Sequence, residues 1–157
     1  MILAKPGIVE SIYIAPQATG AVKAVTQVRA VAGYGLEGDR YFTKTGTFSP
    51  KDVPDRQLTL IESEAIEGLA RDYSIELAAG DARRNIVTRG VALNHLVGLE
   101  FRVGEVLLLG TRLCEPCAHL ESLTKPGVRA GLIHRGGLRA EIVVGGTIAV
   151  GDELREK

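Results

Sequence analysis

Glycine is distributed along this chain in a way that favours many short extended segments over long helices. The chain has 157 residues and 19 glycines, and many glycines fall where alternating apolar segments should end. This punctuation is typical of β-rich domains built from short strands. Two segments instead have helical character, residues 62–72 and residues 128–133. The pattern predicts a mainly β (α+β) fold, a β-barrel with a few short helices, formed as one domain over residues 1–157.

Apolar alternation locates the strands of this predicted barrel. Extended segments are expected at residues 8–14, 22–32, 57–61, 86–88, 101–109, 138–144 and 147–150. The pair Gly145-Gly146 supplies the positive φ angles of a two-residue turn, so it predicts a hairpin between the last two strands. Three glycines within residues 33–40 predict tight turns. The polar residues 43–56, rich in Pro and Gly, predict a long loop.

Composition argues against two classes of partner. The 19 basic and 19 acidic residues give zero net charge, and there is no Trp, so neither a cationic surface nor a set of stacking aromatics for nucleic acid is expected. No apolar stretch approaches the roughly 20 residues that span a bilayer. The N-terminus also lacks the pattern of a signal peptide. We therefore expect a cytoplasmic protein with reduced thiols and no membrane partner.

The two cysteines lie in a Cys-Glu-Pro-Cys turn, Cys114 to Cys117, directly after the apolar run 106–109. A thiolate at the end of a buried strand can act as a soft metal ligand, a redox partner or a nucleophile. A buried, inert cysteine is the competing interpretation. Zinc held with His119 and His134 is a further alternative, although the histidine spacing is unlike that of a zinc finger. A disulfide exchanger is disfavoured, because no helix is expected after Cys117.

Several arginines lie beside predicted turns and strand ends. The guanidinium fork binds phosphate in a bidentate manner, and neighbouring glycines expose backbone N–H groups to an anion. Asp39 orients Arg40, takes part in proton transfer or caps a turn. The competing interpretation pairs each arginine with a surface acid. The candidate residues for an anionic or phosphorylated ligand are Arg40, Arg83, Arg84, Arg112 and Arg135, with Asp39 as a further candidate site residue beside Arg40.

An ordered set of segments across nearly the whole chain resembles the MOSC domain, which is named after the C-terminal part of molybdenum cofactor sulfurases. The segments are Gly35–Arg40, Arg56–Glu62, Arg83–Thr88, Leu93–Asn94, Val97–Gly98, Phe101–Gly104, Arg112–Cys117 and Arg135–Leu138. The chain is most similar to free-standing bacterial members with the Cys-Glu-Pro-Cys turn. The set as a whole is specific, whereas Cys-x-x-Cys alone would not be.

The resemblance implies a barrel like that of pyruvate kinase, and the molybdenum cofactor (molybdopterin) as ligand. It implies that Cys117 coordinates molybdenum or carries sulfur, with Cys114 in support. Arg83 and Asn85 match the Arg-x-Asn that holds the pterin in reductases of the family. The chain lacks the separate N-terminal β-barrel domain of the mitochondrial members. It also has no desulfurase, flavin or iron–sulfur domain of its own.

Three functional hypotheses follow from the resemblance and the residues. The first is a small reductase of N-hydroxylated compounds that takes electrons from an external donor protein. The second is a carrier that receives sulfur from a donor protein and holds it as a persulfide on Cys117. The third is a non-catalytic module that binds a phosphorylated ligand through its arginines.

Overall fold

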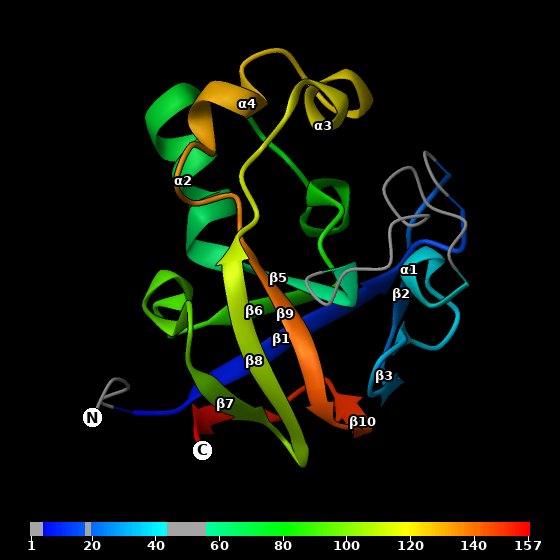
Figure 1. The fold of residues 1–157 in the computed structure, drawn as a ribbon. Helices are drawn as coiled ribbons and strands as arrows, with labels where there is room; N and C mark the ends of the chain where they lie inside the picture. Colours follow the sequence, from blue (N-terminus) through cyan, green and yellow to red (C-terminus); the bar gives the residue numbers. More distant parts are fainter. Residues whose placement is uncertain (1–4, 18–19, 44–55) are drawn as a thin grey trace.

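A closed barrel of seven strands forms the body of the molecule (Figure 1). The computed structural model describes residues 5–17, 20–43 and 56–157. The strands follow one another around the barrel in the order β1, β11, β7, β8, β9, β5 and β6, and β6 pairs again with β1. Their bounds are β1 (Gly7–Ile14), β5 (Leu58–Glu62), β6 (Ile86–Arg89), β7 (Glu100–Val103), β8 (Val106–Leu113), β9 (Leu138–Val144) and β11 (Glu153–Glu156). The predicted β-barrel is confirmed.

Alternating side chains of the barrel strands divide between two apolar cores. Inward-facing residues such as Leu60 and Ile86 fill the barrel with Phe101 and Leu108. Ile61 and Val87, one position further along, point outward and join a second core with the helices. This period-two alternation is what a strand imposes on its neighbours. Strands β5 and β6 therefore contribute both to the barrel interior and to the surface on which the helices pack.

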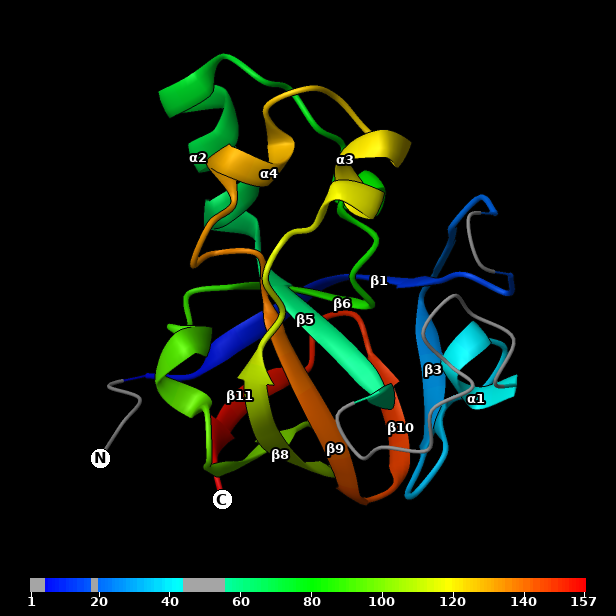
Figure 2. The ribbon, with the colours of Figure 1, turned by 45° about the horizontal axis from the view of Figure 1, so that its top comes forward.

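The helices that supply this second core lie over one end of the barrel (Figures 1 and 2). They are α2 (Ser63–Tyr73), η2 (Ala79–Ala82), α3 (Ala118–Leu123) and α4 (Val128–Gly131). The segments predicted as helical, 62–72 and 128–133, correspond to α2 and α4. Helix η3 (Leu93–Leu96) and the short helix α1 (Arg40–Thr43) complete the helical elements of the described residues. Among the described residues, none of the helices combines the length and apolar character needed to span a bilayer.

A second, three-stranded sheet corrects two of the strand predictions. Residues 22–32 are not one strand, because β2 (Lys23–Val25) pairs with β1 while β3 (Gln27–Val31) pairs with β10 (Gly146–Ala149) and β4 (Gly35–Leu36). The predicted hairpin at Gly145-Gly146 is wrong for the same reason. The chain leaves β9 there and changes sheet to reach β3, so β9 and β10 do not pair.

Two further strand assignments differ from expectation. Residues 101–109 form two strands, β7 and β8, that turn back on each other at Gly104 and Glu105. Strand β11 was not predicted, because Leu154 is its one buried residue. It nevertheless closes the barrel between β1 and β7. Most of the predicted long loop, residues 44–55, lies outside the described residues.

Candidate functional site

The Cys114–Cys117 turn begins where β8 leaves the barrel, beneath the helices. The backbone N–H of Cys114 donates to the Gly137 carbonyl over 2.7 Å. A Cβ atom at Gly136 would lie 2.6 Å from the Cys114 carbonyl oxygen, so only glycine allows the two segments to pack this closely. Gly136 and Gly137, beside Arg135, are therefore buried next to the thiol turn, whereas Gly33 and Gly38 in the loop before Arg40 are exposed.

The two cysteines, both free thiols, differ in exposure. Cys114 is 2% exposed, whereas Cys117 is half-buried and packs against the helical core. Helix α3 starts at the next residue, and the Cys117 carbonyl accepts from the Glu121 N–H at 3.1 Å. The expectation that no helix follows Cys117 is therefore wrong, and with it the reason for disfavouring a disulfide exchanger.

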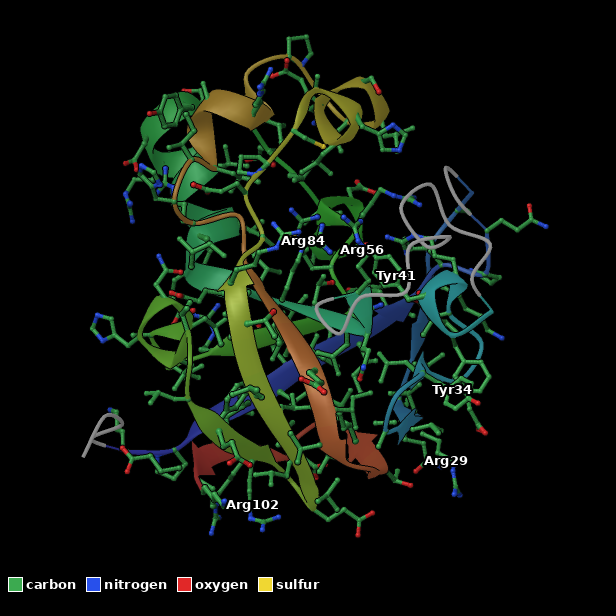
Figure 3. All side chains as sticks on the ribbon, in the orientation of Figure 1. Arg29, Tyr34, Tyr41, Arg56, Arg84 and Arg102 are labelled. Atoms are coloured by element: carbon green, nitrogen blue, oxygen red, sulfur yellow. The ribbon has the colours of Figure 1, made fainter. Side chains whose placement is uncertain are left out.

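Both thiols line a pocket with a cavity volume of about 60 Å³. Four arginines also line this thiol pocket, Arg40, Arg83, Arg84 and Arg139. Its other lining residues are Tyr41, Glu115, His119, Leu120 and Leu123. Figure 3 shows Arg84 and Tyr41 at the end of the barrel that lies beneath α3. Three of the candidate arginines, from different parts of the chain, thus converge beside the cysteines.

Arg83 occupies a strained backbone position at the edge of the pocket. It ends η2 in the left-handed conformation, with φ 58° and ψ 34°, which non-glycine residues seldom adopt without a functional or structural reason. Its Nη1 donates to the Gly20 carbonyl over 2.6 Å. Burial lowers the pKa of Arg83, and repulsion from Arg40 lowers it further. The pocket is therefore a place where positive charges repel one another and an anion would be stabilised.

Arg84 supports the thiol turn itself. Its Nε donates to the Gly136 carbonyl at 2.8 Å, and its Nη2 donates to the Cys114 carbonyl at 3.2 Å. One guanidinium thus joins the start of β6 to both segments that frame the cysteines. Because two of its N–H directions are taken by carbonyls, Arg84 contributes charge and rigidity to the pocket wall.

A buried polar network lies behind the pocket and holds Arg40 and Tyr41. Asp39 is 0% exposed. Its carboxylate accepts from the backbone N–H of Ala15 at 2.9 Å and of Tyr41 at 3.2 Å. The Asn85 Nδ2 donates to the same carboxylate at 3.3 Å. The network therefore ties the end of β1 to the start of α1, which carries two residues of the pocket.

Asn85 completes this network on the barrel side. Its Oδ1 accepts from the Thr59 N–H at 3.0 Å, and its Nδ2 also donates to the Tyr13 carbonyl at 3.0 Å. Asn85 is 3% exposed and does not line the thiol pocket. Asn85 and Asp39 therefore lie behind the residues that line the pocket, and their hydrogen bonds hold the segments of Ala15, Tyr41 and Thr59 in place.

Two predicted binding residues lie away from the pocket. Arg135 donates through Nε to the Gly131 carbonyl at 2.8 Å and forms an ion pair with Asp72 at 3.2 Å, so it joins α4 to α2. Arg112 is exposed near the end of β8. Its register partner on β9 is Arg139, which does line the pocket. The structure thus brings Arg139 to the pocket and leaves Arg112 outside its lining.

The zinc interpretation is not supported by the geometry. Within residues 5–17, 20–43 and 56–157, no group of three or more His, Cys, Asp or Glu side chains could hold a metal ion. His134 is exposed and pairs through Nδ1 with Glu115 at 2.8 Å. His119 lines the pocket beside the cysteines, so the two histidines have different surroundings.

Sequence reasoning missed Tyr41 and Arg139. Arg40 lies over the Tyr41 ring, with its Cζ 4.6 Å from the ring centroid. Tyr41 directly follows the Gly35–Arg40 segment, and that adjacency was an available signal. Arg139 lies between the buried Leu138 and Ala140 on β9, so strand alternation predicts that it points out of the barrel.

Comparisons with known proteins agree with this architecture. The YuaD protein from Bacillus subtilis is 18% identical, with a TM-score of 0.79 over 96% of this chain and 94% of that chain. YiiM from Geobacillus stearothermophilus is 16% identical, with a TM-score of 0.73 over 96% of this chain and 74% of that chain. YiiM from Escherichia coli is 20% identical, with a TM-score of 0.65 over 96% of this chain and 67% of that chain.

Because the sequence identities are this low, the similarity to the three structures shows that the fold is shared and shows nothing about function. No curated protein matches the sequence. The family model for the MOSC domain matches residues 46–155, which cover more than half of the chain and include the thiol turn. The chain belongs to the MOSC domain family.

Proposed function

We propose that this protein binds the molybdenum cofactor through Cys117 and reduces N-hydroxylated compounds with electrons from an external donor protein. One observation supports the proposal above the others: the half-buried Cys117 and four arginines line the same pocket. A soft thiolate suits molybdenum, and guanidinium groups suit the phosphate and oxo groups of such a cofactor.

The donor set of the pocket fits the cofactor. Cys117 would supply the thiolate, since Cys114 is 2% exposed. Arg40, Arg83 and Arg139 would hold anionic groups. The cavity volume of about 60 Å³ is small beside the 300–1,000 Å³ of common ligand sites. The enclosed part of the pocket therefore suits one end of the cofactor.

Cys117, Arg40, Arg83 and Arg139 would hold the cofactor, which would supply the redox chemistry that removes oxygen from the N-hydroxyl group. The reaction consumes two electrons and two protons, cleaves the N–O bond, and releases the amine and water. The electrons come from a flavin or iron–sulfur protein. The chain itself binds and orients: Asp39 and Asn85 hold the segments that carry Arg40 and Arg83, and Leu120 and Leu123 limit water at the pocket.

Metal and pterin analysis tests this proposal. Protein made in a host that synthesises the cofactor should contain molybdenum and pterin in equal amounts. Cys117→Ser should lose most of the molybdenum, whereas the matched variant Cys114→Ala should retain it. Preparations without metal and pterin, or equal retention in the two variants, would contradict the role of Cys117.

The size of the cavity also favours a second candidate, a persulfide carrier. A cavity of about 60 Å³ accommodates one additional sulfur atom on Cys117, and the surrounding arginines would stabilise the persulfide anion. The carrier would receive this sulfur from a desulfurase that acts on cysteine. Mass spectrometry after incubation with such an enzyme should find the mass of one added sulfur on the peptide of Cys117. An unmodified thiol would exclude this candidate.

A further inference from the structure

Glu115 is the one acidic residue among the described residues that line the thiol pocket. It lies in the thiol turn, between the two cysteines. Four arginines line the same pocket. A carboxylate that pointed at these arginines would pair with them and compete with an anionic ligand. The direction of the Glu115 side chain therefore affects whether the pocket can take such a ligand.

The Glu115 carboxylate is turned toward His134. Its Oε1 accepts from the backbone N–H of His134 at 2.7 Å, and its Oε2 pairs with the ring Nδ1 of the same residue at 2.8 Å. His134 thus holds both carboxylate oxygens at once. The side chains of Glu115 and His134 are 44% and 78% exposed, so the pair lies at the surface of the molecule.

The backbone around His134 is fixed in a conformation that permits this double contact. His134 has a φ of 64°, in the left-handed region that non-glycine residues seldom adopt. Its carbonyl accepts from the Asn94 Nδ2 at 2.7 Å. A Cβ atom at Gly136 would lie 2.8 Å from the Pro116 Cδ, so the segment after His134 packs directly on the thiol turn. Figures 1 and 2 show the connection from α4 to β9 beside the connection from β8 to α3.

We propose that His134 is a positioning residue, which holds the Glu115 carboxylate away from the arginines so that the thiol pocket accepts an anionic ligand. That the pocket takes an anion rests on the proposed function above. Without the His134 ring, one of the two contacts that hold the carboxylate is lost, and Glu115 turns toward the arginines more often. The backbone N–H contact remains, and exposed ion pairs contribute little free energy. The loss of the ring therefore weakens anion binding without abolishing it.

Inorganic sulfate is a suitable probe, because it is a small oxyanion whose charge does not change near neutral pH. Titrations followed by NMR chemical shifts measure its affinity for the wild-type protein, His134→Gly, Glu115→Gln and the variant with both substitutions. Glycine suits the φ of 64° at position 134, so His134→Gly should fold. The control is His95→Gln, which changes an exposed histidine outside the pocket.

The four variants give distinct expected affinities. His134→Gly should bind sulfate about threefold more weakly than the wild-type protein. Glu115→Gln should bind it at least as tightly as the wild-type protein, because it removes a negative charge from the pocket lining. The variant with both substitutions should match Glu115→Gln, and His95→Gln should match the wild-type protein.

Three results would overturn the inference. The first is an equal loss of affinity from His134→Gly with and without Glu115→Gln, which would mean that His134 only shapes the loop. The second is an unchanged affinity in His134→Gly. The third is a wild-type protein that does not bind sulfate.

Molybdenum content separates this inference from the proposed function. If the wild-type protein takes up no molybdenum, the reductase proposal fails, whereas a loss of sulfate affinity in His134→Gly that Glu115→Gln removes would still establish the role of His134. If the wild-type protein retains molybdenum and His134→Gly leaves sulfate affinity unchanged, this inference alone fails.

Discussion

Replacement of Asp39 by asparagine tests the buried network that positions the pocket. The Asp39 carboxylate accepts from two backbone N–H groups, of Ala15 at 2.9 Å and of Tyr41 at 3.2 Å. An asparagine has only one oxygen in its amide, so one of these buried donors would face an NH₂ group. An unsatisfied buried donor costs about 1–3 kcal/mol, and the other bond loses its charge assistance. We expect a loss of about 3 kcal/mol in the free energy of unfolding.

Urea denaturation followed by circular dichroism measures this loss. With a slope of about 2 kcal/mol per molar urea, the midpoint should fall by about 1.5 M. The exposed neighbour Glu37 provides the control, since Glu37→Gln should change stability by less than about 0.5 kcal/mol. A midpoint for Asp39→Asn that matches the control would refute the assignment of Asp39 as the centre of the network.

Three further predictions test the surroundings of the site. In Gly137→Ala, a Cβ would lie 2.2 Å from the Leu60 carbonyl oxygen at a φ of 121°, so urea denaturation should show a loss of about 3 kcal/mol or more. In Arg84→Ala the thiol turn loses two hydrogen bonds, so Cys114 should react faster with an alkylating reagent. Mass spectrometry of the modified protein over time measures this rate, and an unchanged rate would contradict the supporting role of Arg84. Burial raises the pKa of the Glu62 carboxyl in the folded protein. The stability that the protonated carboxyl contributes is therefore fully present below the pKa of Glu62 in the unfolded chain. It is lost as the pH rises through the pKa of Glu62 in the folded protein. Glu62→Gln should therefore gain stability relative to the wild-type protein between pH 4 and pH 7 in parallel urea titrations, and a constant difference would argue against this shift.

Local patterns predicted most of the fold, because strand alternation depends on neighbouring residues. Residues 57–61 and 138–144 correspond to β5 and β9 for this reason. The failures concern pairing. The chain changes sheet near Thr26 and again at Gly145, and these changes depend on β3 meeting β10 across more than a hundred residues. The single buried leucine of β11 likewise gives too weak a pattern to mark a strand.

The site was predictable where residues are close in sequence and less so where folding brings them together. The thiol turn and the arginines at strand starts were recognised from local context. Asn85 has the same context as Arg83, yet its side chain joins the buried network, because Arg83 ends η2 in the left-handed conformation whereas Asn85 directly precedes β6. Arg139 was missed because its place in the pocket follows from the pairing of β8 with β9.

The binding-module hypothesis makes a contrasting prediction for the same residues. A module that uses only its arginines should keep its affinity for a phosphorylated ligand in Cys117→Ala and lose affinity in Arg83→Ala. Under the reductase proposal, both variants should lose cofactor.

X-ray absorption at the molybdenum edge tests most directly whether Cys117 is the metal ligand. The molybdenum that Cys117→Ser retains should show one sulfur ligand fewer than the molybdenum of the wild-type protein, with no change in Cys114→Ala. An identical sulfur coordination in Cys117→Ser and the wild-type protein would contradict the account.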